Sequence, residues 1–187
     1  MQVYCIKSYK NIYKTELPAA VLTVGFDLRG LMRRKDRQVT DFDKMIEIMQ
    51  KCDCCRLGLW DGSEVYIVAV NFGFEESSTS VTLYFHSAKI GKKIDILKAN
   101  SKVTFEMDTG HRLLQGESAC DCTFLYQSII GSGIVSFVDD NTEKNHGLSC
   151  IMKHYCGKYV NDFSQDMLKN TLVIRLDVTE WTCKQHI

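Results

Sequence analysis

Hydrophobic and polar positions follow two different periods along the chain from Met32 onward. Apolar side chains recur every three or four positions in segments that are bounded by helix-capping residues, which is typical of amphipathic helices. A capping box beginning at Thr40 precedes the first of these segments, and Gly157 ends the third, whose N-cap is Asn141 or Asp140. The expected helices are residues 41–51, 89–98 and 142–155, with a short helical turn at 164–169.

The segments between these helices alternate apolar and polar residues or form short apolar runs, which predicts strands. The dipeptide Asp61-Gly62 between the first two is a strong hairpin signal. Short turns of this kind favour antiparallel pairing, so we expect a mainly β fold in which six or seven mostly antiparallel strands close into a small barrel with helices at its ends. The expected strands are residues 55–60, 64–72, 81–86, 103–107, 124–130, 134–138 and 171–181.

The regular pattern of apolar and polar residues begins at Met32, and residues 1–31 show no sustained hydrophobic period. We therefore predict one domain over residues 32–187, preceded by an extension that is either a start-site artefact or an arm packing on a dimer. The apolar stretch from Leu17 to Leu28 is interrupted by Pro18 and Asp27, and it is shorter than the roughly 20 residues of a spanning helix. No cleavage signature follows it, so we expect a cytoplasmic protein that neither spans nor binds a membrane.

The charge balance removes one further class of function. The 187 residues carry 23 basic and 23 acidic side chains, so no net positive field steers the protein onto nucleic acid.

Nine cysteines without a secretory signal argue against a disulfide framework. The pairs Cys52/Cys54 and Cys120/Cys122, and His154 with Cys156, are candidate metal ligands, but one intervening residue is unusual for zinc. We expect buried free thiols and no metal.

A candidate anion site lies where the third strand ends and the second helix begins. His86 ends the strand, and the small residues Ser87 and Ala88 leave room for a ligand beside the backbone. The helix N-terminus offers unpaired N–H groups, with cationic side chains at Lys92 and Lys93. These features predict a phosphate seat. The alternative is a strand–helix junction with solvated lysines.

The sequence resembles the nitroimidazole-resistance (Nim) branch of the flavin split-barrel superfamily, which is related to pyridoxamine 5′-phosphate oxidase. The resemblance covers about residues 32–184 in consistent order. It is carried by Met32-Arg33-Arg34-Lys35-Asp36-Arg37, Cys55-Arg56-Leu57, Tyr66-Ile67-Val68, Val70-Asn71-Phe72-Gly73-Phe74, residues 83–93, Tyr126, Ser128-Ile129-Ile130-Gly131, Ile151-Met152-Lys153-His154-Tyr155 and Glu180-Trp181-Thr182.

The resemblance implies a homodimer that holds FMN, or FAD, at the subunit interface, with residues of both chains in each site. It places the isoalloxazine ring against Val68 and Asn71 and the phosphate at Gly91 and the two lysines. The residues that it assigns to the cofactor are Val68, Asn71, His86, Ser87, Ala88, Gly91, Lys92, Lys93, Ser128 and Trp181. Three positions depart from the family pattern: Ala69 replaces a proline, Gln127 an arginine and Cys183 a glycine.

The activity implied by the resemblance is a flavin-dependent reduction of nitroimidazole or other electron-poor compounds. Gly131-Ser132-Gly133 lacks the third glycine and the following helix of a dinucleotide-binding motif, so it predicts a turn or bulge. Without such a motif, a reduced nicotinamide donor would dock only transiently. His86 is the candidate proton donor, or a structural hydrogen-bonding group. Trp181 either stacks on the cofactor or fills the core.

Two other functions stay open at this point. The barrel could bind haem, with His86 or His154 as axial ligand, or hold flavin without turnover. A pyridoxamine-phosphate-oxidase activity is the least favoured function, because Arg175 stands alone where that enzyme has a basic substrate-phosphate cluster.

Overall fold

A computed structural model describes residues 32–187, and the prediction for residues 1–31 lies outside this range. Within it, eight strands form a single sheet in which every paired neighbour is antiparallel. The mainly β split barrel expected from the sequence is therefore confirmed, with one short strand more than predicted. The strands are β1 (Gln38–Val39), β2 (Cys55–Trp60), β3 (Val65–Val70), β4 (Phe72–Glu76), β5 (Val81–Ser87), β6 (Lys102–Leu114), β7 (Thr123–Val138) and β8 (Leu172–His186).

The sheet curls so that its two outermost strands meet. Its strand order is β3-β2-β6-β7-β8-β5-β4, with β1 added beside β8. The two ends of this path, β3 and β4, are consecutive in the chain, and Asn71 is the only residue between them. The sequence predicted one strand over residues 64–72. The structure divides it at Asn71, because the chain leaves the edge strand β3 there and enters β4, the strand at the other edge of the sheet.

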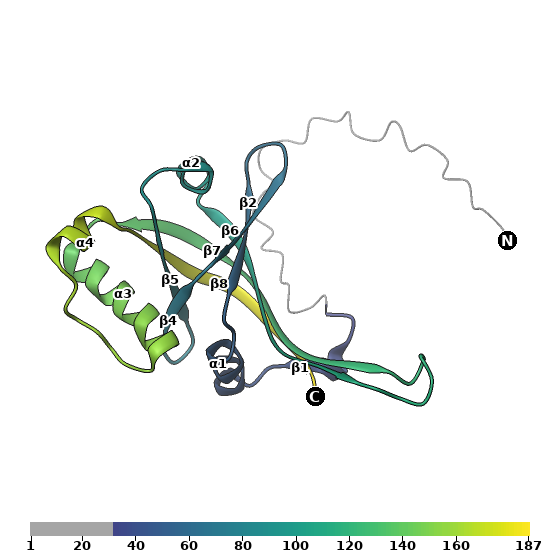
Figure 1. Ribbon diagram of the computed structural model, residues 1–187. Helices are drawn as coiled ribbons and strands as arrows, with labels where there is room; N and C mark the ends of the chain where they lie inside the picture. Colours follow the sequence, from purple (N-terminus) through teal and green to yellow (C-terminus); the bar gives the residue numbers. More distant parts are fainter. Residues whose placement is uncertain (1–31) are drawn as a thin grey trace, which may run out of the picture.

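Four α-helices surround the barrel: α1 (Phe42–Gln50), α2 (Lys92–Ala99), α3 (Asn141–Cys156) and α4 (Gln165–Asn170). Figure 1 shows α1 and α2 near opposite ends of the sheet, with α3 and α4 together on one flank. Helix α1 begins at Phe42, one residue after the predicted start, and its N-cap is Asp41 rather than Thr40. The Asp41 carboxylate accepts a hydrogen bond from the Lys44 amide. Asp140 caps α3, and Gly157 ends it in the left-handed conformation, as predicted. None of the helices described is both long and apolar enough to cross a membrane.

The core lies between the inner faces of the strands, and β2 shows how the sequence determines it. Cys55, Leu57 and Leu59 are fully buried, whereas the alternate residues Arg56 and Trp60 face outward. Burying a large apolar side chain contributes roughly 1.5–3 kcal/mol, so this alternation fixes which face of the strand points inward. Helix α1 closes one end of the core with the buried side chains of Met45, Ile48 and Met49.

The segment 124–138 was predicted as two strands joined through a turn or bulge at Gly131-Ser132-Gly133, and the division into two strands is wrong. Strand β7 is continuous through Gly131 and Gly133, and only a register shift against β8 between Ser132 and Gly133 marks the place. A Cβ at Gly131 would lie 2.4 Å from the ring of Phe105, and one at Gly133 would lie 2.3 Å from the carbonyl oxygen of Asp177. The glycines therefore allow close approach across a coiled sheet, and the predicted bulge is confirmed.

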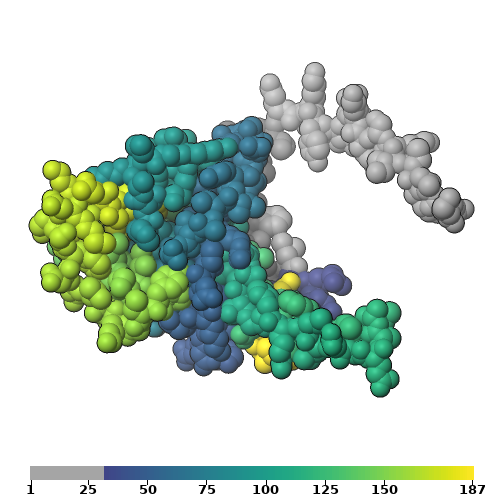
Figure 2. All heavy atoms as spheres, viewed as in Figure 1, coloured from purple at the N-terminus to yellow at the C-terminus, as the bar shows by residue number. Residues whose placement is uncertain are grey.

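Strands β6 and β7 continue beyond the barrel as a long hairpin. The hairpin projects away from the body of the molecule at the lower right of Figures 1 and 2, and its tip carries the exposed residues Cys120 and Cys122. Leu113 and Phe124, near the tip, are about half exposed. The hairpin thus extends apolar side chains away from the core of its own chain.

Candidate functional site

The predicted site residues at the end of β5 lie on an open corner of the barrel. Phe85 pairs with Phe72 in the β4–β5 ladder, so His86 and Asn71 occupy the next register position. His86, Asn71 and Ala88 are exposed, and Ser87 is partly buried. Asn71 and His86, which the resemblance assigns to the cofactor, thus lie next to each other where β3 passes into β4.

Helix α2 begins at this corner, where the amides of Ile94 and Asp95 donate to the Gly91 carbonyl and those of Lys92 and Lys93 have no partner within the helix. Its N-cap is Gly91, whose φ of 128° suits glycine and which has no side chain to cap the helix, whereas α1, α3 and α4 are capped by Asp41, Asp140 and Ser164. The first amides of a helix have no intrahelical partner, and together they carry a partial positive charge. A Cβ at Gly91 would meet no atom within 4 Å, so the space in front of the helix is open. The helix starts at Lys92, three residues after the predicted start, because Gly91 departs from helical geometry.

The two lysines of α2 have different surroundings. Lys92 is exposed, and its Nζ lies 3.4 Å from Asp61 Oδ2, 3.7 Å from Glu64 Oε1 and 4.9 Å from the centre of the Tyr66 ring. Lys93 is partly buried, and this burial lowers the pKa of its ammonium group. Lys92 is therefore an exposed cation that pairs with carboxylates of the β2–β3 hairpin, whereas Lys93 is a partly buried cation.

The sequence did not identify the carboxylates around Lys92. Asp61 was assigned only to the turn, where its Oδ1 accepts hydrogen bonds of 2.9 Å from the amides of Ser63 and Glu64. These bonds, and more weakly Lys92, hold the pKa of the Asp61 carboxyl well below its usual range. The hairpin itself could be predicted from the sequence. The approach of the hairpin to α2 depends on the curvature of the barrel.

Strand β3 presents an edge beside this corner. It ends the strand order, so one side of its backbone is without a partner strand among residues 32–187. The side chain of Val68 is partly buried and packs against the core. A planar ring at this edge would therefore meet the backbone N–H and C=O groups of β3 rather than the isopropyl group of Val68.

Ser128 and Trp181 lie far from the corner within one chain. His86 pairs with Val173 on β8, and Trp181 is eight residues farther along that strand, a distance of about 26 Å along the backbone. Ser128 pairs with Lys184, farther still, and it faces outward with Ile130. The structure thus divides the predicted site into two separated groups.

Trp181 is partly buried beside the first helix. Its ring packs edge-on against Phe42 at a centroid distance of 5.8 Å. It also lines a hollow of about 480 Å³ that includes Gln38 and Thr179. The contact with Phe42 and the packing of Trp181 against the main core cluster support the packing interpretation of this residue.

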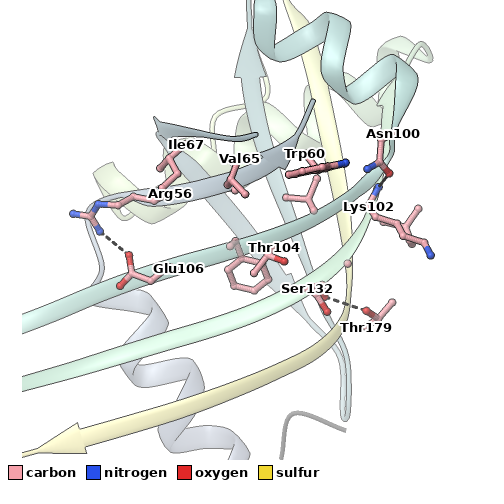
Figure 3. A pocket seen from close by; sticks show the side chains of 15 residues that line it. Arg56, Trp60, Val65, Ile67, Asn100, Lys102, Thr104, Glu106, Ser132 and Thr179 are labelled. Carbon is pink, nitrogen blue, oxygen red and sulfur yellow. Dashed lines mark hydrogen bonds and ion pairs between the residues drawn. The ribbon is translucent and has the colours of Figure 1, made fainter. Parts of the chain in front are cut away.

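A second feature, which the sequence did not predict as a site, is an apolar groove of about 850 Å³ on the outer face of β2, β3, β6 and β7 (Figure 3). Trp60, Val65 and Ile67 form one wall, and these side chains are 50%, 61% and 67% exposed. At one end, Arg56 bonds to Glu106 at 3.0 Å and to Asp108 at 2.7 Å. The sequence did contain a signal for this groove, because residues 65–70 are apolar on both faces of the strand. A strand with only one face against the core alternates apolar and polar residues instead.

The candidate haem ligands differ in availability. His154 Nε2 lies 2.8 Å from the carbonyl oxygen of Cys52, so Nε2–H donates to it, and Nδ1 lies 3.3 Å from Gln50 Nε2. Burial lowers the pKa of His154, which favours this neutral ring. Both ring nitrogens are thus engaged within the protein. His86 is exposed at the corner.

The expectation of buried thiols holds for only part of the cysteines. Cys52, Cys55, Cys150 and Cys183 are buried, and Cys120, Cys122 and Cys156 are exposed. Burial raises the pKa of Cys52 and Cys183 to about 12. The predicted candidate pairs do not form a three-ligand metal cluster in the described part of the chain.

Comparison with known families identifies the chain. Residues 41–185 match the family described as Pyridoxamine 5'-phosphate oxidase. The chain belongs to this family. The resemblance read from the sequence is therefore confirmed, and the barrel is the flavin-binding split barrel of the pyridoxamine 5'-phosphate oxidase family.

Several solved structures share the fold over most of their length. A proposed 5-nitroimidazole antibiotic resistance protein from Bacteroides thetaiotaomicron VPI-5482 has 31% identity and a TM-score of 0.69, and the alignment covers 79% of this chain and 86% of that one. The flavocytochrome Anf3 from Azotobacter vinelandii has 14% identity and a TM-score of 0.67, over 84% and 72% of the two chains. A FAD and heme binding protein from Mycobacterium smegmatis has 14% identity and a TM-score of 0.66, over 80% and 73%. No curated protein matches the chain.

Proposed function

We propose that this protein is a cytoplasmic, homodimeric flavin-dependent reductase of nitroimidazoles or other electron-poor compounds, with FMN as its cofactor. The carrying observation is the open corner at His86, where an uncapped helix N-terminus and two lysines lie beside the free edge of β3. Such a corner fits a phosphorylated planar cofactor. The similar protein from B. thetaiotaomicron supports the choice of nitroimidazoles as substrates.

The phosphate would be held by α2. The amides of its first turn donate hydrogen bonds, and the ammonium groups of Lys92 and Lys93 add charge. To serve there, Lys92 turns from the carboxylates of Asp61 and Glu64 toward the phosphate. The FAD form of the cofactor would use the same seat, with its second phosphate and adenosine extending into solvent or along the partner.

The separation of the predicted residues supports the dimer. Ser128 and Trp181 are too far from His86 for one flavin ring to contact both groups in the same chain. A two-fold axis would bring Ser128 of one chain toward the corner of the other, and the apolar groove of Trp60 and Ile67 supplies a surface that such an interface would bury. Each site would then contain residues of both chains.

When bound, the flavin supplies hydride or electrons to the acceptor. The backbone of β3 would orient the ring by hydrogen bonds, and the partner chain would exclude water from it. His86 stands at the mouth of the site, where its imidazole can hold a proton close to the oxygen of a nitro group that is gaining charge. A reduced nicotinamide would bind only transiently.

The proposal is tested by steady-state oxidation of a reduced nicotinamide by the purified protein, with and without a nitroimidazole. We expect oxidation that depends on the nitro compound and on bound flavin. The matched variant His86→Gln keeps a hydrogen-bonding group but cannot carry the proton, so it should retain flavin and lose turnover at neutral pH. A bound flavin that no donor reduces, or a haem spectrum in place of a flavin spectrum, would contradict the proposal.

A further inference from the structure

Three side chains on the flank of the barrel bring a carboxylate, an imidazole and a thiol together. Glu75 lies on β4, and His146 and Cys150 lie one turn apart on α3. Glu75 Oε2 is 2.6 Å from His146 Nε2, and Cys150 Sγ is 3.6 Å from the same nitrogen. His146 is exposed but not isolated, because its ring contacts both of the other side chains. Among the residues described, this is the one group of three potential ligand atoms within 4.8 Å of one another.

We propose that Glu75, His146 and Cys150 form a zinc site with a fourth position open to water. The site is independent of the proposed flavin function. The three donors are an oxygen, a nitrogen and a sulfur, which suit a borderline metal such as Zn²⁺. Ionised Glu75 and a Cys150 thiolate would together neutralise the charge of the ion.

The spacing of the donors fits four-coordinate zinc. Tetrahedral bonds of about 2.3 Å to sulfur and about 2.0 Å to nitrogen separate those two atoms by about 3.5 Å. The observed separation of Cys150 Sγ from His146 Nε2 is 3.6 Å. The shorter Glu75–His146 contact is a hydrogen bond, and it would open to about 3.3 Å when the metal replaces the shared proton.

A hydrogen bond from a buried tyrosine positions the Glu75 carboxylate. The hydroxyl of Tyr84 donates to Glu75 Oε1 at 2.8 Å, which leaves Oε2 directed toward His146 and Cys150. Tyr84 is fully buried, and its ring meets the His146 ring edge-on at 5.6 Å. Hydrogen bonds of this kind fix the orientation of metal ligands and raise metal affinity.

The surrounding burial defines an open site rather than a closed one. Cys150 is 1% exposed, whereas the His146 side chain is 46% exposed. Water can therefore reach the fourth position from the side of His146, as in sites that exchange a ligand. Glu75 pairs with Thr82, four residues along β5 from His86, so the zinc site lies about 13 Å along the strand from the flavin corner.

The test uses the full-length protein, freed of metal with a chelator and then dialysed against Zn²⁺. Bound zinc is measured by inductively coupled plasma mass spectrometry, and X-ray absorption at the zinc edge identifies the ligands. We expect one zinc per chain with one sulfur ligand at about 2.3 Å. His146→Ala, a change at an exposed side chain, should weaken binding at least tenfold, and Tyr84→Phe should weaken it about 10–100-fold.

Two control variants locate the site. Cys156→Ser removes an exposed thiol from the same helix, and Cys120→Ser/Cys122→Ser removes both thiols of the hairpin tip. Both should bind zinc like the unchanged protein. Wild-type affinity in His146→Ala, loss of zinc in either control, a spectrum without sulfur, or no zinc binding at all would overturn the proposal. None of these results depends on flavin occupancy.

Discussion

Gly73 on β4 lies directly against the backbone of Cys150 on α3. A Cβ at Gly73 would lie 2.3 Å from the carbonyl carbon and 2.5 Å from the carbonyl oxygen of Cys150. No side chain other than hydrogen fits there, so this glycine lets α3 lie flat on the strand. The contact joins the helix to the strand that also leads from Asn71, and it brings Cys150 beside Glu75.

We therefore expect Gly73→Ala to lower the free energy of unfolding by about 3 kcal/mol or more, because backbone atoms must move apart. Chemical denaturation with matched m-values measures the change. Gly157→Ala is the control, since a Cβ there meets no atom within 4 Å and only the positive φ is unfavourable, at about 1 kcal/mol. Equal losses in the two variants would contradict the packing account.

The lysines at the start of α2 should govern flavin affinity. Lys92→Ala and Lys93→Ala each remove a charge-assisted hydrogen bond to the phosphate, so each should weaken flavin binding about tenfold. Fluorescence titration of flavin into the cofactor-free protein measures the dissociation constant. Lys98→Ala, an exposed lysine at the far end of the same helix, should leave it unchanged. If all three variants bind flavin equally well, the phosphate seat lies elsewhere.

The apolar groove should be the dimer contact. Ile67→Asp places a charge on its wall, and burying an unpaired carboxylate is costly, so the variant should run as a monomer with lower flavin occupancy. Sedimentation velocity at several concentrations reports the state of association. Met167→Asp makes the same kind of change on α4, where Met167 is 44% exposed, and it should leave the dimer intact. A dimeric Ile67→Asp protein would place the interface on another face.

The thiols should divide sharply in reactivity. Burial raises the pKa of Cys52 and Cys183 to about 12, so both stay protonated at pH 8. Because the thiolate is the nucleophile, an alkylating reagent should modify the exposed Cys120, Cys122 and Cys156 at least about 100-fold faster. Peptide mass spectrometry over time gives each rate. Rapid labelling of Cys52 in folded protein would show that its surroundings open to solvent.

Much of the fold could be predicted from the sequence, because local signals agreed with the tertiary structure. The helix starting after Asp140 and ending at Gly157 follows from capping chemistry, and the alternation along Cys55–Trp60 separates the inner face from the outer one. The glycines at 131 and 133 misled the prediction. Their role is close approach across the sheet, which depends on neighbours that are distant in sequence.

The candidate site could be predicted only in part. His86 and Lys92 belong to one short segment, where the end of a strand and the start of a helix could be predicted from local signals. The separation of Trp181 from His86 depends on the register of β5 against β8, and the carboxylates around Lys92 come from a hairpin 30 residues away. Glu75, His146 and Cys150 meet because two glycines, Gly73 and Gly147, let α3 approach the sheet, and no single segment carries that information.

Native mass spectrometry of the full-length protein is the sharpest test of flavin binding at a dimer interface, because one spectrum reports subunits and cofactor together. We expect an assembly of two chains and two flavins, with flavin released when the subunits are separated by collision. A single chain that retains a full complement of flavin, or a dimer that carries haem or no cofactor after incubation with flavin, would contradict it.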